Sequence, residues 1–162
     1  MLLGGGISGC AYEPAGDPPP AATAERSGRP APTVPTKGPE ILDVEAANYV
    51  ELERRLAVAR GSVILDEAGP ADGPGVGFSK TATVESSGAY TVTAACVGMT
   101  NAQIFLSLPE PGREPLALNL NCSGVLSQVI ELREGHVGAA LIRPDPTGPW
   151  TGAVAGVRIT AE

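Results

Sequence analysis

The feature that most constrains the fold is a change of hydrophobic period near residue 62. From there to the end of the chain, short apolar runs show a period of two, and clusters of Gly, Pro and Asn separate them. This pattern is typical of β-strands joined by tight turns. Seven or eight such strands predict a β-sandwich or jelly-roll-like domain over residues 62–162. We expect the strands at 62–66, 78–85, 89–97, 102–108, 115–122, 126–133, 136–143 and 151–160.

The alternation also predicts which residues form the core. Tyr90, Val92, Ala94 and Cys96 share one face of their strand. Because successive side chains of a strand point to opposite sides, this face should be buried. Later strands carry similar aliphatic sets: Ile104, Leu106 and Leu108, then Leu116, Leu118 and Leu120, and finally Ala153, Ala155, Val157 and Ile159.

One helix is predicted before the β domain, over residues 41–61. Asp43 is the expected N-cap, and Gly61 is the expected stop. Acidic residues come early and arginines late, which suits the helix dipole. We expect the helix to pack on the outside of the β domain through a stripe of residues spaced by three and four: Leu42, Ala46, Tyr49, Leu52, Leu56 and Ala59.

A Pro-rich segment precedes the helix. Half of the chain's 16 prolines lie between residues 11 and 40, and this stretch has almost no large apolar residues. Such a segment cannot bury enough surface to offset the entropy lost on ordering. We therefore expect residues 10–40 to be a disordered tether of polyproline II character.

Cys10 stands at the start of this tether and follows Ile7, Ser8 and Gly9. A branched aliphatic residue, two small residues and a cysteine resemble the lipobox of bacterial lipoproteins. The resemblance implies that Cys10 is acylated and becomes the mature N-terminus, and that residues 1–9 are the remnant of a signal peptide. It also implies an extracytoplasmic protein that a lipid anchor holds on the cell membrane. The alternative is an unmodified cysteine in a disordered N-terminal segment.

If Cys10 is the lipidation site, two of the three cysteines remain, Cys96 and Cys122, and an even number can pair completely. Each lies on the apolar face of its predicted strand. Together with the export route that the lipobox implies, their number and position favour a disulfide between them. Reduced thiols in a cytosolic protein are the alternative.

No catalytic constellation stands out in the sequence. His136 is the only histidine, and no Gly-x-Ser-x-Gly motif is present to place a nucleophile. His136 follows Glu134-Gly135 at a predicted turn, so we expect a solvated side chain. We predict no catalytic residues and no cofactor.

The net charge of −7 and the scattered basic residues argue against a nucleic-acid partner.

Acidic residues beside the Gly- and Pro-rich segment 66–77 are weak candidates for a metal site. Asp66, Glu67 and Asp72 lack the spacing of an EF-hand. We expect a solvated acidic connection between two strands, with a loose calcium site as the alternative.

Two aromatic residues are candidates for a ligand-facing role. Trp150 precedes the last predicted strand and should share a face with Gly152 and Gly156. There it would stack on a sugar ring, cover the glycines or pack against the helix. Phe105 falls opposite the aliphatic face of its own strand, where it would join such a surface.

These features favour a cell-envelope lipoprotein with a non-enzymatic binding or structural role. Besides the membrane, its partner would be an envelope protein or a glycan. Two other functions stay open. One is a small secreted hydrolase with carboxylates on separate loops. The other is a cytosolic β domain with a disordered N-terminus.

Overall fold

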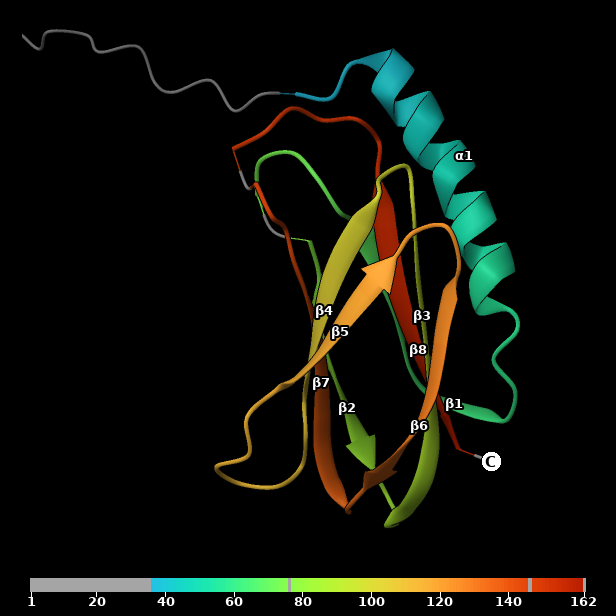
Figure 1. The fold of residues 1–162 in the computed structure, drawn as a ribbon, viewed down its shortest axis with the longest axis vertical. Coiled ribbons are helices and arrows are strands. Elements are labelled where there is room, and N and C mark those ends of the chain that lie inside the picture. Colours follow the sequence, from blue (N-terminus) through green and yellow to red (C-terminus); the bar gives the residue numbers. More distant parts are fainter. Residues whose placement is uncertain (1–35, 76, 146, 162) are drawn as a thin grey trace, which may run out of the picture. The chain divides into compact units, whose positions relative to one another are not determined.

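The computed structural model describes residues 36–75, 77–145 and 147–161. It contains one helix and eight strands (Figure 1), so the prediction of a mainly β fold with one preceding helix is confirmed. Cys10, the signal remnant and nearly all of the predicted tether lie outside the described residues and stay predictions. The elements are α1 (Pro39–Leu56), β1 (Ser62–Pro70), β2 (Ser79–Val84), β3 (Gly88–Val97), β4 (Asn101–Ser107), β5 (Leu116–Asn121), β6 (Val125–Leu132), β7 (Gly135–Ile142) and β8 (Val154–Ala161).

The strands form two antiparallel sheets of four strands each. The first sheet has the order β1-β8-β3-β6, and the second has the order β2-β7-β4-β5. The chain crosses between the sheets at almost every connection, which is jelly-roll connectivity. The sheets lie face to face, so each has one inner and one outer surface.

The space between the sheets holds the main hydrophobic core. Val92, Ile104, Val137 and Ile159 are fully buried there. All of the aliphatic sets predicted from the alternation contribute to this core. The inward and outward faces of the strands are therefore fixed by the pattern in the sequence.

A disulfide joins Cys96 of β3 to Cys122, which directly follows β5, so the predicted pairing is confirmed. Both cysteines are buried. Arg55 of α1 donates hydrogen bonds from Nη1 to the carbonyl oxygens of Cys96 and Cys122, at 2.8 and 2.6 Å. The helix and one strand of each sheet are thus linked at a single point.

The helix begins and ends earlier than predicted. Gly38, not Asp43, is the N-cap, and its carbonyl accepts hydrogen bonds from the Ile41 and Leu42 amides. The reason is Pro39, which occupies the first turn, where its fixed φ suits a helix and its missing N–H is not needed. The last helical residue is Leu56, and Gly61, with a φ of 94°, turns the chain into β1.

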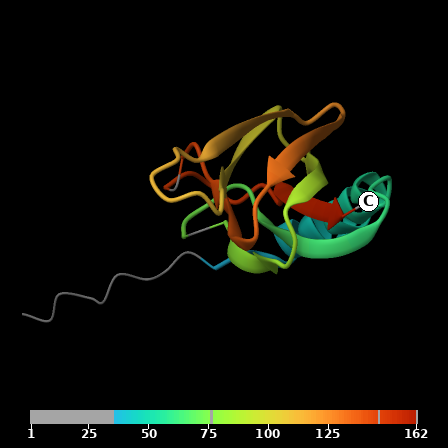
Figure 2. The same cartoon turned by 90° about the horizontal axis from the view of Figure 1, so that it is seen from below.

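The predicted contact stripe of the helix is correct for Tyr49, Leu52 and Leu56 and wrong for its first residues, and Ala59 lies beyond the end of the helix. Leu52 and Leu56 are fully buried against β3 and β8, but Leu42 and Ala46 are exposed. Near the middle of the helix Asn48 faces the segment that precedes β8, and its Nδ2 donates to the Gly152 carbonyl at 2.8 Å. Figure 2 shows α1 lying against the layer that contains β8.

Gly152 explains the shift of the stripe. A Cβ at this position would lie 3.0 Å from the Glu45 amide nitrogen and from Val44 Cγ1. The missing side chain lets the helix backbone come close to the chain before β8. The position of the helix therefore depends on Gly152. A pattern of hydrophobic residues does not predict such a contact.

Candidate functional site

The two outer surfaces of the sandwich differ in how they are covered. Helix α1 packs on β3 and β8 of the first sheet. It is the only helix among the described residues, so no helix covers the outer surface of the second sheet there. We call this surface the open face. Its residues alternate with the core residues of β2, β7, β4 and β5: Ser79, Thr81, Thr83, Asn101, Gln103, Phe105, Ser107, Ala117, Asn119, Asn121, His136, Gly138, Ala140 and Ile142.

Phe105 is the one aromatic side chain of the open face. In register beside it lie Ala117 on β5 and Ala140 on β7. Because these neighbours are short, the half-buried ring borders a shallow hollow of about 190 Å³. Gly138 and Ser107 line the same hollow. The predicted position of Phe105, opposite the aliphatic face of its strand, is confirmed.

Two pairs of amide side chains lie across β4, the strand of Phe105, and its neighbour β5. Gln103 is in register with Asn119, and its Nε2 donates to the Asn119 Oδ1 at 2.8 Å. Asn101 is in register with Asn121 one step further along. These four residues line a second hollow, of about 350 Å³. A side-chain amide carries both donors and acceptors, and of these the Asn121 Oδ1 already accepts from the amide and the hydroxyl of Ser123.

No Asp, Glu, Lys or Arg is among the strand residues of the open face. Lys80 of β2 borders the Phe105 hollow, but it alternates with the open-face residues and its ammonium lies 3.4 Å from a carboxylate oxygen of Glu67 on β1. His136 lies exposed at the edge of the face, beside Thr83 on β2. His136 is the second residue of β7 and pairs with Thr83 of β2, so it belongs to the strand and not to the predicted turn. The sequence alone does not show this pairing.

Trp150 lies elsewhere, and its predicted position beside Gly152 and Gly156 is wrong. Strand β8 begins at Val154, not at 151, so the alternation does not extend back to Trp150. Leu56 of α1 covers Gly156. Trp150 instead packs on Gly73, where a Cβ would lie only 2.2 Å from its ring, and the Lys37 ammonium lies 4.1 Å from the ring centroid.

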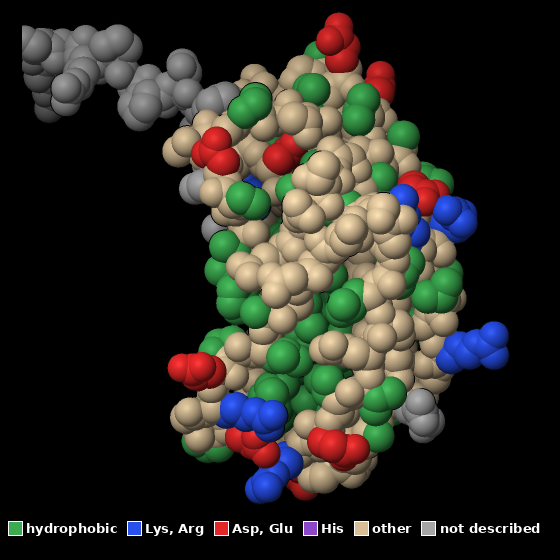
Figure 3. All heavy atoms as spheres, viewed as in Figure 1, with side chains coloured by type: hydrophobic (Ala, Val, Ile, Leu, Met, Phe, Trp, Pro, Cys, Tyr) green, Lys and Arg blue, Asp and Glu red, His purple; other side chains and the backbone are tan. Residues whose placement is uncertain are grey.

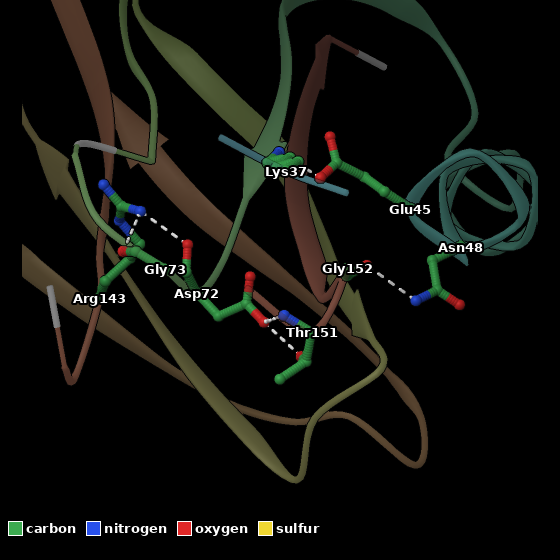
Figure 4. Close-up of polar contacts among 8 residues, drawn as sticks. All are labelled: Lys37, Glu45, Asn48, Asp72, Gly73, Arg143, Thr151 and Gly152. Atoms are coloured by element: carbon green, nitrogen blue, oxygen red, sulfur yellow. Dashed lines mark hydrogen bonds and ion pairs between the residues drawn. The ribbon is translucent and has the colours of Figure 1, made fainter. Parts of the chain in front are cut away.

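Polar contacts of Arg143 and Asp72 hold the loops at Gly73 and Thr151 in place (Figure 4). Arg143, 7% exposed, donates from Nη1 to the carbonyl oxygens of Asp72 and Gly73. The Asp72 carboxylate accepts hydrogen bonds from the amide and hydroxyl of Thr151. The Asp72 carboxylate therefore joins its own loop to the segment that precedes β8.

The acidic residues proposed as weak metal candidates are not brought together. Asp66 and Glu67 lie within β1, which runs to Pro70 and does not end at 66, because residues 67–70 pair with β8. Asp66 contacts Arg158 at 2.6 Å, whereas Glu67 faces Lys80. Within the described ranges, no group of three or more His, Cys, Asp and Glu side chains is arranged to hold a metal ion. No helix of the described residues is long and apolar enough to cross a membrane.

No protein-family model matches the chain, and no curated protein matches its sequence. Solved structures match weakly. A carbohydrate-binding module (CBM6cm-2) from Cellvibrio mixtus lichenase 5A, in complex with cellotriose, is 13% identical with a TM-score of 0.34; the match covers 51% of this chain and 65% of the module, less than two thirds of its length. The C-terminal CBM6 of LamC from Zobellia galactanivorans is 18% identical with a TM-score of 0.36, covering 62% and 94% of the two chains.

A third solved structure has a different biological setting. The C-terminal domain of A223, a structural protein of Sulfolobus turreted icosahedral virus, is 15% identical with a TM-score of 0.34; the match covers 64% of this chain and all of that domain. Identities and TM-scores this low assign the chain to no family.

Proposed function

We propose that this chain is a non-enzymatic binding domain of the bacterial cell envelope, and that it binds a neutral glycan on the open face. The observation that carries the proposal is the setting of Phe105. An aromatic ring stands between short side chains, next to four amides, on a surface without charged strand residues.

The chemistry of a sugar matches this setting. A pyranose ring has an apolar face of C–H groups, which packs on an aromatic ring, and a rim of hydroxyl groups. Side-chain amides can donate to and accept from such hydroxyls at the same time. No cationic side chain of the described strands projects from the open face, and Lys80, which borders the Phe105 hollow, has its ammonium 3.4 Å from a carboxylate oxygen of Glu67, so the face favours a neutral glycan over an acidic one.

Gel electrophoresis through soluble neutral polysaccharides tests the binding role. We expect glucans, mannans or xylans to retard the protein, and an acidic polysaccharide to retard it less. Phe105→Ala should weaken binding about tenfold, which corresponds to about 1.4 kcal/mol. Val50→Ala is the matched control, because it shortens an apolar side chain that is 72% exposed on α1, away from the open face.

Two results would contradict the glycan proposal. One is that no neutral polysaccharide retards the wild-type protein. The other is that Phe105→Ala is retarded as strongly as the wild type, which would place the ligand elsewhere.

The cellular location is a separate part of the proposal. We propose that Cys10 carries the lipid anchor, with the Pro-rich segment as a tether to the β domain. The lipobox resemblance at residues 7–10 supports this location, and so does the Cys96–Cys122 disulfide, since disulfides persist in oxidising compartments outside the cytosol.

Mass spectrometry of the protein from bacterial membranes tests the anchor. The expected N-terminal peptide begins at Cys10 and carries the mass of attached acyl chains. A peptide that runs unbroken through Gly9 and Cys10 with a free thiol would contradict the anchor, but not the glycan-binding role of the domain.

A further inference from the structure

A large hollow lies away from the open face, between β5 and β6. Its volume is about 1100 Å³. Strand β6 is the edge of the first sheet and β5 is the edge of the second, so the hollow is the open side of the sandwich. Figure 3 shows apolar side chains gathered in this hollow, with charged side chains at its lower end. We call it the β5–β6 groove.

The floor of the groove is apolar. Leu108, Leu116 and Ile130 are partly buried there and pack against the main core. Gly88, at the start of β3, also lines the groove, and a Cβ placed on it would have no atom within 4 Å. Because Tyr90, two residues later, points into the core, a side chain at position 88 would point into the space between the sheets.

The edge of β6 has few of the usual features that block strand addition, and its one charged residue is Glu131. The strand is eight residues long, pairs with β3 in unbroken register, and contains no Pro and no Lys. The other edges are less regular: β1 has a register shift between Val63 and Leu65, β2 carries Lys80, and β5 has six residues. A regular free edge presents unpaired N–H and C=O groups that can template a further strand.

We propose that the β5–β6 groove binds an extended peptide of another protein, which adds to β6 as a further strand. Alternate side chains of such a strand point into the groove, so those residues must be apolar to match Leu116 and Ile130. The main-chain hydrogen bonds supply affinity, and the apolar floor selects the alternating pattern.

The charges around the groove favour a peptide that also carries Lys or Arg. Glu110 forms ion pairs with both Arg113 and Arg133, at 3.0 Å from the Nε of Arg133. Glu114 and Glu131 also line the groove and take part in no ion pair within the described residues. A basic residue at an end of the peptide would therefore meet a free carboxylate.

A second copy of the chain fits the groove less well than a free peptide. If β6 of one copy paired with β6 of another, the inward positions of the added strand would be 126, 128, 130 and 132, and its apolar inward side chains would be Leu126, Ile130 and Leu132. These side chains already pack in the core of their own copy. A free peptide has no such prior contacts and can fill the groove.

Fluorescence anisotropy with a dye-labelled synthetic peptide tests the proposal. In the probe, valine and threonine alternate between terminal lysines. We expect saturable binding, weakened about tenfold when glutamates replace the lysines. Two further probes carry N-methyl groups, one on the valines and one on the threonines. Because only alternate N–H groups of an added strand face β6, one N-methylated peptide should bind like the parent and the other should not bind.

Two phenylalanine substitutions in the protein, one inside the groove and one outside it, test the position of the bound peptide. Gly88→Phe places a ring in the groove and should weaken binding of the valine–threonine probe at least about tenfold. Gly124→Phe is the control, because its Cβ also has no atom within 4 Å, and it lies in the turn between β5 and β6, outside the groove lining. Neither glycine has a positive φ, so both variants should fold.

Several outcomes would overturn the proposal. The first is the absence of saturable binding of the probe, and the second is equal binding by both N-methylated peptides. The third is unchanged binding to Gly88→Phe. A concentration-dependent dimer that Gly88→Phe abolishes, without binding of the probe, would assign the groove to self-association. None of these results depends on Phe105 or on the glycan proposal.

Discussion

Arg55 is the residue that connects the helix to both sheets. Besides its bonds to the Cys96 and Cys122 carbonyls, its Nε donates to a carboxylate oxygen of Glu51 at 2.8 Å. Arg54 contacts the same carboxylate at 2.7 and 2.8 Å. Glu51 therefore holds Arg55 in the orientation that reaches the disulfide.

These hydrogen bonds predict how acid affects stability. Those from Arg54 and then Arg55 lower the pKa of Glu51 from its ordinary value of 4.5 to about 2. A lowered folded-state pKa contributes stability above pH 4.5, and this contribution is lost as the pH falls toward 2. The contribution is small, because the carboxylate lies at the surface and is screened by solvent.

Urea unfolding of wild type and Glu51→Gln measures this effect. We expect the wild type to be more stable at neutral pH and the difference in unfolding free energy to shrink between pH 4.5 and about 2. A difference that stays constant over this interval would mean that the charge of Glu51 has no role.

At the scale of elements, glycines decide how closely α1 approaches the first sheet. Gly152 has a φ of 83° and has the Glu45 amide nitrogen 3.0 Å from the position of a Cβ. We predict that Gly152→Ala lowers the free energy of unfolding by about 2 kcal/mol, from left-handed strain and from displacement of the helix. Chemical denaturation followed by circular dichroism measures the loss.

Gly88→Ala is the control for this prediction. Gly88 lies in a strand, has no positive φ, and has open space around a Cβ. Its substitution should change the unfolding free energy by less than about 0.5 kcal/mol. Equal effects of the two alanines would show that helix docking does not depend on Gly152.

The sequence predicts the elements better than it predicts their partners. The period of two placed all eight strands, because burial between two sheets requires one apolar face on each strand. It could not show that Gln103 and Asn119 are in register, since register depends on tertiary pairing. Trp150 was misplaced for a related reason: the alternation does not reveal where β8 begins.

For the whole molecule, the Cys96–Cys122 disulfide closes a loop with a sequence separation of 26. On the chain-entropy model such a loop contributes about 3.5 kcal/mol to stability. We predict that a double variant, Cys96→Ala with Cys122→Ala, loses about this amount in urea unfolding. The variant should be insensitive to reducing agent, whereas the wild type should lose a similar amount when reduced. No change on reduction would contradict a structural role for the bridge.

The two proposed binding surfaces lie on different sides of the molecule. The open face belongs to the second sheet, and the β5–β6 groove lies on the side where both sheets end. The sequence indicates Phe105 as a ligand-facing residue because it falls opposite the aliphatic face of its strand. It gave no sign of the groove, since a groove between two edge strands exists only once the order of strands in each sheet is known.

The most direct test of the central claim is an NMR titration of the isotope-labelled protein with a neutral oligosaccharide. The side-chain amide signals of Gln103 and Asn119 report on the open face itself. We predict that these signals, and the backbone amides of β4, β5 and β7, shift progressively to saturation, and that Phe105→Ala removes the shifts. Shifts confined to α1 or to the β5–β6 groove, or no shifts with any neutral oligosaccharide, would contradict binding on the open face.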